Sequence, residues 1–142
     1  FNEDFYHRQD GWRGLASYYD IGAEARTALE RGEFVVTSVG LTYELLSNGD
    51  VQLASGFATD PQLLRPSLVV LDDDRDYFLP YQPSPTAHAP TVEAQPEVLA
   101  ALAPVADSLD ASTMQRLNRQ VLRNGAAPRA VAETHLEEAG RG

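Results

Sequence analysis

Four aspartates within five positions are the first residues whose chemistry needs an explanation. They are Asp72, Asp73, Asp74 and Asp76, in the stretch LDDDRDYFLPYQPSP. Their carboxylate oxygens would suit calcium or magnesium, but a calcium loop spaces its ligands at alternate positions around a glycine. Three adjacent aspartates cannot all face one ion without unusual backbone geometry, whereas aspartate readily bonds its own backbone at a turn. The pattern therefore favours a strand end and a turn, with a metal-dependent hydrolase that uses these four carboxylates as the alternative.

A run of aromatic residues and prolines follows the aspartates directly. Tyr77, Phe78 and Tyr81 lie in this run, and Phe57 stands at the end of another apolar segment. Aromatic faces carry a negative quadrupole, so several of them arranged as a box attract a quaternary ammonium, which has no hydrogen-bond donor on its nitrogen. Large aromatic side chains also pack in cores. From the residues alone both roles are open, and core packing is the first interpretation.

The composition excludes several other kinds of chemistry. The 142 residues include no cysteine, so thiolate catalysis and cysteine metal sites are excluded. The three histidines have no short ligand spacing, and the sequence contains neither a G-x-S-x-G nucleophile motif nor a phosphate-binding glycine loop. With 21 acidic and 11 basic side chains the net charge is −10, which argues against nucleic acid as a partner because a phosphate backbone needs a basic surface. No cofactor is predicted.

The elements that must position these residues change in character along the chain. Apolar runs rich in β-branched residues predict strands at residues 34–39, 51–57 and 68–71. Helical spacing and end signals predict helices at residues 12–19, 23–31, 40–46, 96–106, 110–123 and 128–140. Prolines predict extended or loop structure throughout residues 80–96. The chain is therefore expected to be α/β at first and all-helical at its end.

Several helix ends and faces are predicted individually. Asn48-Gly49 is expected to end the helix at residues 40–46, Asp110 or Ser112 to cap the helix at residues 110–123, and Gly125 to stop it. Helical periodicity also predicts which apolar side chains of the last two helices face inward. These are Met114, Leu117, Val121, Leu122, Val131 and Leu136.

Four segments of the chain carry sequence patterns that occur together, in the same order, in one known family of proteins. The stretch LVVLDDDRDYFLPY (68–81) is similar to L-x-V-L-E-D-D-K-x-F-F-P-P-Y, and DFYHRQDGWRGLASYYD (4–20) to E-F-x-x-R-x-D-G-x-x-G-L-x-x-x-Y-G. GLTYELLSNGDVQLASGFATD (40–60) is similar to G-L-x-Y-x-A-L-x-N-G-x-V-D-V-x-x-A-Y-S-T-D, and residues 96–140 to P-E-L…M-x-x-L-N…V-A-x-x-F-L. These are patterns of the glycine betaine/carnitine/choline-binding proteins of ABC transporters, which the chain resembles over nearly its whole length.

The resemblance implies an α/β, periplasmic-binding-protein type II-like fold in which two lobes close over a ligand. Because complete members are longer, the chain is expected to form an incomplete two-lobe fold. Residues 1–60 would form part of the second lobe, and residues 61–142 the hinge return and the C-terminal helical part of the first lobe. The implied role is non-enzymatic and extracytoplasmic, periplasmic or cell-surface, with a lipid anchor or permease fusion outside this chain. The implied partners are a small quaternary-ammonium solute and a membrane permease.

The resemblance also assigns four residues to the ligand site. Phe57 and Tyr81 match aromatic positions of the family's ligand box, and Arg8 matches an arginine that contacts the ligand carboxylate. Thr59 lies in the matching turn and would contribute its hydroxyl. Phe57 stands where tyrosine is usual, so it keeps the aromatic face and loses the hydroxyl bond. The family's other box residues have no counterpart in this chain, so these 142 residues alone are expected to bind solute weakly or not at all.

Other outcomes stay open beside the importer component. A half-fold leaves strand edges and apolar faces uncovered, so a homodimer or a domain-swapped structural module is possible. The metal-dependent hydrolase that uses Asp72–Asp76 is the enzymatic alternative. Tyr77 and Phe78 are assigned to packing and not to the ligand site.

Overall fold

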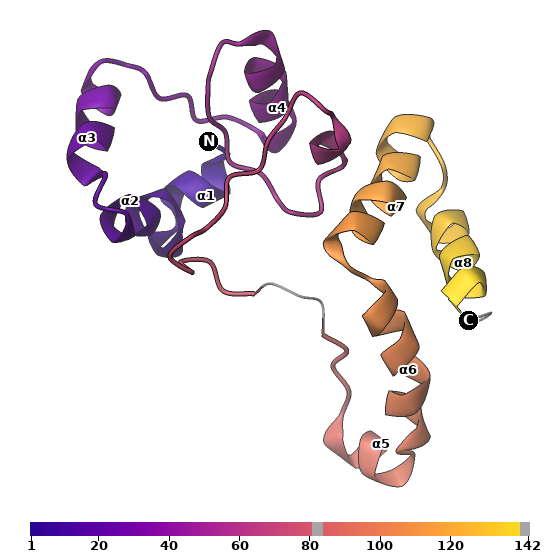
Figure 1. The fold of residues 1–142 in the computed structure, drawn as a ribbon. Helices are drawn as coiled ribbons and strands as arrows, with labels where there is room; N and C mark the ends of the chain where they lie inside the picture. Colours follow the sequence, from indigo (N-terminus) through magenta and orange to yellow (C-terminus); the bar gives the residue numbers. More distant parts are fainter. Residues whose placement is uncertain (81–83, 140–142) are drawn as a thin grey trace. The chain divides into compact units, whose positions relative to one another are not determined.

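The computed structural model describes residues 1–80 and 84–139, and it divides into two compact units (Figure 1). The first unit consists of Phe1–Phe57 and Ser67–Leu79, and the second of Ala58–Pro66 and Pro80–Gly142. None of the described helices is long and apolar enough to cross a membrane.

Short helices make up most of the regular structure of the first unit. They are α1 (Glu3–His7), η1 (Gln9–Arg13), α2 (Gly14–Tyr18), α3 (Gly22–Glu30) and α4 (Val39–Asn48). The segment η1 is a π-helical turn that is kinked at Gly11, whose backbone is not helical. The helices predicted at residues 12–19, 23–31 and 40–46 are confirmed, although the first of them begins inside the π-helical turn. The backbone at Gly49 has a φ of 81°, a left-handed conformation that glycine adopts without strain, so the predicted end of α4 is also confirmed.

The strand expected at residues 34–39 pairs with another segment at one point. Thr37 N donates to Phe1 O at 3.0 Å, and Glu3 N donates to Thr37 O at 3.2 Å. These bonds form a single parallel bridge between Asn2 and Thr37. The N-terminal residues therefore run beside the segment that leads into α4, and this pairing fixes where α1 begins.

Residues 1–80 and 84–139 contain no β-strand. The strands predicted at residues 51–57 and 68–71 are therefore wrong for this structure. An extended segment becomes a strand only when a neighbouring backbone takes up its N–H and C=O groups. The 68–71 segment instead lies open, and the side chains of Val69 and Val70 are 83% and 66% exposed. The α/β part of the predicted fold class is therefore not confirmed.

Four partly exposed aromatic rings form a cluster in the first unit, whose buried apolar residues are Ala16 and Tyr43. Phe1 stacks on Trp12 with ring centroids 4.5 Å apart, and Phe34 lies 5.4 Å from Phe1 and 5.2 Å from Trp12. Phe5 joins this group from α1, with its ring 5.9 Å from that of Phe1. Aromatic pairs at such distances stabilise beyond the apolar area that they bury. The cluster holds the N-terminus, α1 and η1 to one another.

The second unit is helical in its described part. Its helices are η2 (Pro61–Leu64), α5 (Ala89–Ala94), α6 (Glu97–Ser108), α7 (Ala111–Asn124) and α8 (Pro128–Ala139). Asp110 caps α7 by accepting a hydrogen bond from Thr113 N at 2.6 Å, and this bond is the main reason that the pKa of Asp110 is lowered. Gly125 ends α7 with a φ of 68°, so both predicted ends of this helix are confirmed.

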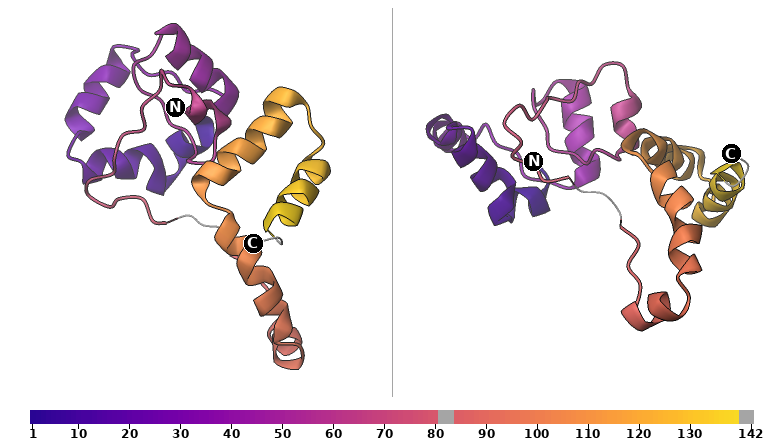
Figure 2. Two further views of the ribbon diagram at one scale, coloured as in Figure 1. Left: turned by 45° about the vertical axis from the view of Figure 1, so that its right-hand side comes forward. Right: turned by 60° about the horizontal axis from the view of Figure 1, so that its bottom comes forward.

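Side-chain hydrogen bonds and one buried valine hold the second unit together. Gln115 and Asn118 of α7 donate to the carbonyls of Ala58 and Thr59, at 2.7 and 3.0 Å, just before η2 begins. Figures 1 and 2 show α8 lying beside α7. Val131 of α8 is 6% exposed, so its inward position is confirmed.

Three expectations for the second unit are wrong. Leu122 and Leu136 are 69% and 47% exposed instead of buried, because the apolar pattern of α7 and α8 is wider than the faces that their neighbours cover. Residues 80–96 are not all extended, since α5 occupies Ala89–Ala94. Pro90 stands in the first turn of α5, where a missing N–H removes no helical hydrogen bond.

Candidate functional site

A cavity of about 470 Å³ in the first unit is lined by five side chains from α1 and from the end of the 51–57 segment. They are Glu3, Asp4, His7, Arg8 and Phe57. Two residues assigned to the ligand site from sequence, Arg8 and Phe57, are thus brought together although they are far apart in the chain. The cavity is a surface hollow that is widely open to solvent, and its volume falls in the range of small-molecule sites.

Asn2 joins the two segments that line the cavity. Its Oδ1 accepts a hydrogen bond from Phe5 N at 2.8 Å and so caps α1. Its backbone N and its Nδ2 both donate to Ser55 Oγ, at 3.0 and 3.3 Å. Asn2 is only 4% exposed, so these bonds are largely shielded from water. The segment that ends in Phe57 is thereby tied to the beginning of α1.

Arg8 stands at the C-terminal end of α1, where its backbone N–H donates to Asp4 O at 3.1 Å. Its guanidinium pairs with Asp10 through two hydrogen bonds, one from Nε to Oδ1 at 2.9 Å and one from Nη2 to Oδ2. The hydrogen bond from Arg8 lowers the pKa of Asp10. The Arg8 side chain is 59% exposed, so a carboxylate from solution can reach the same guanidinium that Asp10 orients.

Phe57 contributes an aromatic surface to the cavity. Its side chain is among the exposed large apolar groups of the first unit, at 53%. An exposed ring is costly to solvate, and its face attracts cations that have shed part of their hydration. Glu3 and Asp4 line the same cavity with negative charge, so the cavity offers a cation two kinds of attraction beside the guanidinium of Arg8.

Of the other two residues assigned from sequence, Thr59 is not among the residues that line this cavity. Thr59 belongs to the second unit, where its carbonyl accepts the hydrogen bond from Asn118. Tyr81 lies outside the described residues. Their assignment to the ligand site remains a prediction.

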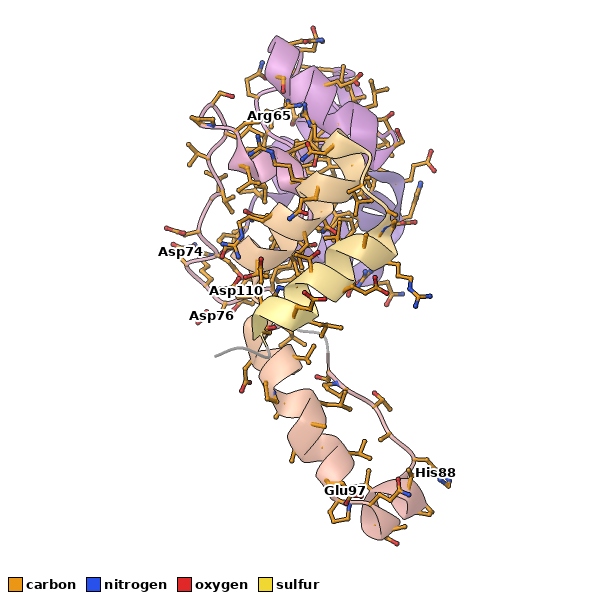
Figure 3. The ribbon with its side chains drawn as sticks, turned by 90° about the vertical axis from the view of Figure 1, so that its right-hand side faces the viewer. Arg65, Asp74, Asp76, His88, Glu97 and Asp110 are labelled. Atoms are coloured by element: carbon orange, nitrogen blue, oxygen red, sulfur yellow. The ribbon has the colours of Figure 1, made fainter. Side chains whose placement is uncertain are left out.

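The acidic run forms a turn, as its sequence predicts. Asp76 N donates to Asp73 O at 3.2 Å, and Asp76 has a φ of 54°, a left-handed conformation that aspartate tolerates better than most residues. Figure 3 shows the side chains of Asp74 and Asp76 pointing away from the ribbon. Among the side chains that the structure describes, no three His, Asp or Glu groups are placed to hold a metal ion. The geometry therefore gives no support to the metal-dependent hydrolase.

Sequence reasoning missed three of the residues that line the cavity. Glu3 and Asp4 precede His7 and Arg8 by four positions, and residues four apart lie on the same face of a helix. That spacing in EDFYHR was the signal that could have grouped them with Arg8. The bonds between Asn2 and Ser55 have no such local signal, because their partners are distant in sequence.

Comparison with known proteins places the chain in a family. Residues 1–138 match the family model of the substrate binding domain of ABC-type glycine betaine transport systems. The chain belongs to this family. The crystal structure of a glycine betaine/carnitine/choline ABC transporter superposes with a TM-score of 0.73 at 27% identity. The superposition covers 96% of this chain and 47% of that one, and it supports a periplasmic-binding-protein type II-like fold for the matched part.

Relatives of the substrate-binding family include proteins named for transport and solute binding, not for catalysis. The chain is 30% identical over 135 residues to the glycine-betaine-binding protein of Pseudomonas aeruginosa, covering 95% of this chain and 42% of that protein. It is 28% identical over 137 residues to the ergothioneine transport permease/ergothioneine binding protein EgtU of Helicobacter pylori strain G27, covering 96% of this chain and 23% of that protein. The chain thus spans less than half the length of these relatives.

Proposed function

We propose that this chain is the solute-binding part of an ABC importer for quaternary-ammonium compatible solutes such as glycine betaine, carnitine or choline. The observation that carries the proposal is the cavity that Arg8 and Phe57 line together in a chain of this family. In this role the chain works outside the cytoplasm and delivers its solute to a membrane permease. The solute is held and not transformed, so no catalytic residue is required.

The cavity chemistry matches a zwitterion with a quaternary ammonium and a carboxylate. The ammonium cannot donate a hydrogen bond from its nitrogen, so an aromatic face and nearby carboxylates suit it better than a single hydrogen-bonded partner. Phe57 supplies the face, and Glu3 and Asp4 supply the negative charge. The solute carboxylate pairs with Arg8, whose planar guanidinium binds carboxylates through two parallel hydrogen bonds.

The family resemblance suggests how binding is communicated to the permease. Residues 1–60 belong to the second lobe in this proposal, and residues 61–142 to the hinge return and the C-terminal part of the first lobe. Solute entry then draws the lobes together by a hinge motion, and the permease recognises the closed form. Thr59 and Tyr81 are proposed to add a hydroxyl and an aromatic face to the closed site.

Replacing Phe57 with leucine tests the aromatic contribution. Leucine keeps an apolar side chain but removes the ring face, so the affinity for glycine betaine should fall about twofold to fivefold, the size of an exposed cation–π contact. Phe57→Tyr is the matched control, because it keeps the ring and should retain the affinity. NMR titration of each variant measures the dissociation constant, and equal affinities for Phe57→Leu and the unchanged chain would remove Phe57 from the site.

A homodimer or domain swap is the second candidate, and it rests on a different observation. Val69, Val70 and Leu71 form an exposed apolar run at 83%, 66% and 68%. Such a run can pair with another copy of the chain. The net charge of −10 opposes close approach of two copies, so the importer component is the better supported function. Light scattering that shows a monomer would exclude the dimer.

A further inference from the structure

Asp73 binds two groups that are separated in sequence. Its Oδ1 accepts a hydrogen bond from the Tyr19 hydroxyl, which lies just beyond the end of α2. Its Oδ2 accepts a hydrogen bond from Phe78 N at 2.7 Å. Its carbonyl accepts the Asp76 N–H that closes the turn. The Asp73 backbone therefore closes the acidic turn, and its side chain fastens the turn to the end of α2 and to Phe78 N.

Arg75 reinforces the same attachment. Its backbone N–H donates to the Tyr19 hydroxyl oxygen at 3.3 Å, and its guanidinium carbon lies 5.1 Å from the centre of the Tyr19 ring. The Tyr18 hydroxyl donates to Arg75 O at 2.7 Å, and Arg75 Nη1 donates to Tyr18 O at 3.3 Å. The turn at residues 72–76 is thus held to the two tyrosines from both its side chains and its backbone.

The attachment determines where the next two residues lie. The Tyr77 hydroxyl donates to Gly11 O at 3.4 Å, and the Phe78 ring lies 6.3 Å from the ring of Phe5. Gly11 N in turn donates to Arg8 O at 3.2 Å. A continuous path of contacts therefore runs from Asp73 through Tyr77 and Gly11 to the residue that lines the cavity.

We propose that Asp73 is a positioning residue for the solute cavity. By fastening the 72–76 turn to Tyr19, it holds Tyr77 against Gly11 and so fixes the end of α1 at which Arg8 stands. This inference rests on the proposed function, because the importance of Arg8 depends on it. It also gives the acidic run a role that neither metal binding nor solute contact provides.

The titration of Tyr19 offers a spectroscopic signature of the attachment. The hydrogen bond to Asp73 raises the pKa of Tyr19 from 10.0 to about 12 and lowers the pKa of Asp73. Asp74 and Arg75 also contact the Tyr19 hydroxyl, and Asp20 lies 3.6 Å from the Arg75 guanidinium. The attachment should therefore be complete at neutral pH and be lost as pH rises from 10 through about 12. It should also weaken as pH falls through the lowered pKa of Asp73.

The test compares Asp73→Asn with Asp72→Asn, which removes the same charge from the exposed neighbour. In Asp73→Asn the NMR signals of Arg8 and Gly11 should move, the tyrosine that titrates near pH 12 should titrate closer to 10, and glycine betaine should bind about tenfold more weakly. Asp72→Asn should leave the NMR signals, the tyrosine titration and the affinity for glycine betaine unchanged. Tyr19→Phe should reproduce the NMR shifts of Arg8 and Gly11. The double variant should shift these signals little further than either single variant, because both substitutions break the same hydrogen bond between Tyr19 and Asp73.

The outcomes separate this inference from the proposed function. If the unchanged chain does not bind glycine betaine, the proposed function fails, while movement of the Arg8 and Gly11 signals in Asp73→Asn still supports the positioning role. If those signals stay in place in a folded Asp73→Asn, the positioning role is wrong whatever the solute data show. Should Asp73→Asn not fold, Tyr19→Phe decides by the same signals, since it retains the bond from Phe78 to Asp73.

Discussion

Replacing Gly11 with alanine should destabilise the first unit by about 3 kcal/mol, the upper end of the usual cost of overpacking a filled site. Gly11 is buried in η1, where a β-carbon would lie far inside van der Waals contact of the Phe5 carbonyl oxygen and 2.8 Å from its carbon. The obstacle is backbone and cannot rotate away as a side chain would. Either α1 or η1 must move, and both belong to the frame that carries Arg8.

The chain offers a direct measurement and a matched control for this prediction. Trp12, the single tryptophan, stacks on Phe1 in the aromatic cluster, so its fluorescence reports denaturant unfolding of the first unit. Gly22→Ala makes the same chemical change at the start of α3, where nothing lies within 4 Å of the added carbon. That control should change the stability by no more than about 1 kcal/mol, in the stabilising direction. If both variants unfold at the denaturant concentration of the unchanged chain, the packing of η1 on α1 is not as described.

Replacing Arg8 with glutamine should have the largest effect on solute choice. Glutamine keeps most of the length and some hydrogen bonding but loses the charge and the paired donors. A hydrogen-bonded carboxylate on an exposed guanidinium is worth about tenfold in affinity, so glycine betaine should bind about ten times more weakly. Choline has no carboxylate, so its affinity should change by less than about twofold on the same physical grounds.

The comparison of the two solutes makes the Arg8 prediction specific. Arg13→Gln is the control, since Arg13 is an arginine of the neighbouring η1 turn that does not line the cavity. NMR titrations of both variants with glycine betaine and choline give the four affinities required. If Arg8→Gln lowers the affinities for both solutes equally, Arg8 has a structural role. If it lowers neither affinity, Arg8 does not belong to the site.

The parts of the fold that the sequence predicted well depend on local chemistry. Gly49 and Gly125 end helices because only nearby backbone geometry decides whether a left-handed residue is needed. Asp110 caps α7 because its partner is three residues away. The strand at residues 68–71 depends on a neighbour elsewhere, and no local pattern can supply that neighbour. The prediction that Leu122 faces inward was wrong for a related reason. Periodicity defines the apolar face of a helix but not how much of that face another element covers.

The candidate site shows the same division between local and distant information. Arg8 and Phe57 were assigned to the ligand site because their motifs resemble a family pattern, and the structure adds that they line one cavity. The acidic turn was predicted from aspartate's bonding to nearby backbone, but the Tyr19 partner of Asp73 was not. Asn2 was also missed, since its bonds to Ser55 join segments that sequence spacing does not relate.

This chain is proposed to hold a quaternary-ammonium zwitterion in the cavity lined by Arg8 and Phe57. NMR titration of the unchanged 142-residue chain with glycine betaine tests it most directly. The sequence left open weak binding or none, and the cavity that Arg8 and Phe57 line together favours the first. The predicted result is therefore weak, saturable binding in the millimolar range, with the largest shifts at residues 3–8 and at Phe57. The contradicting result is a titration in which these signals do not move, or in which the saturable shifts gather at residues remote from this cavity.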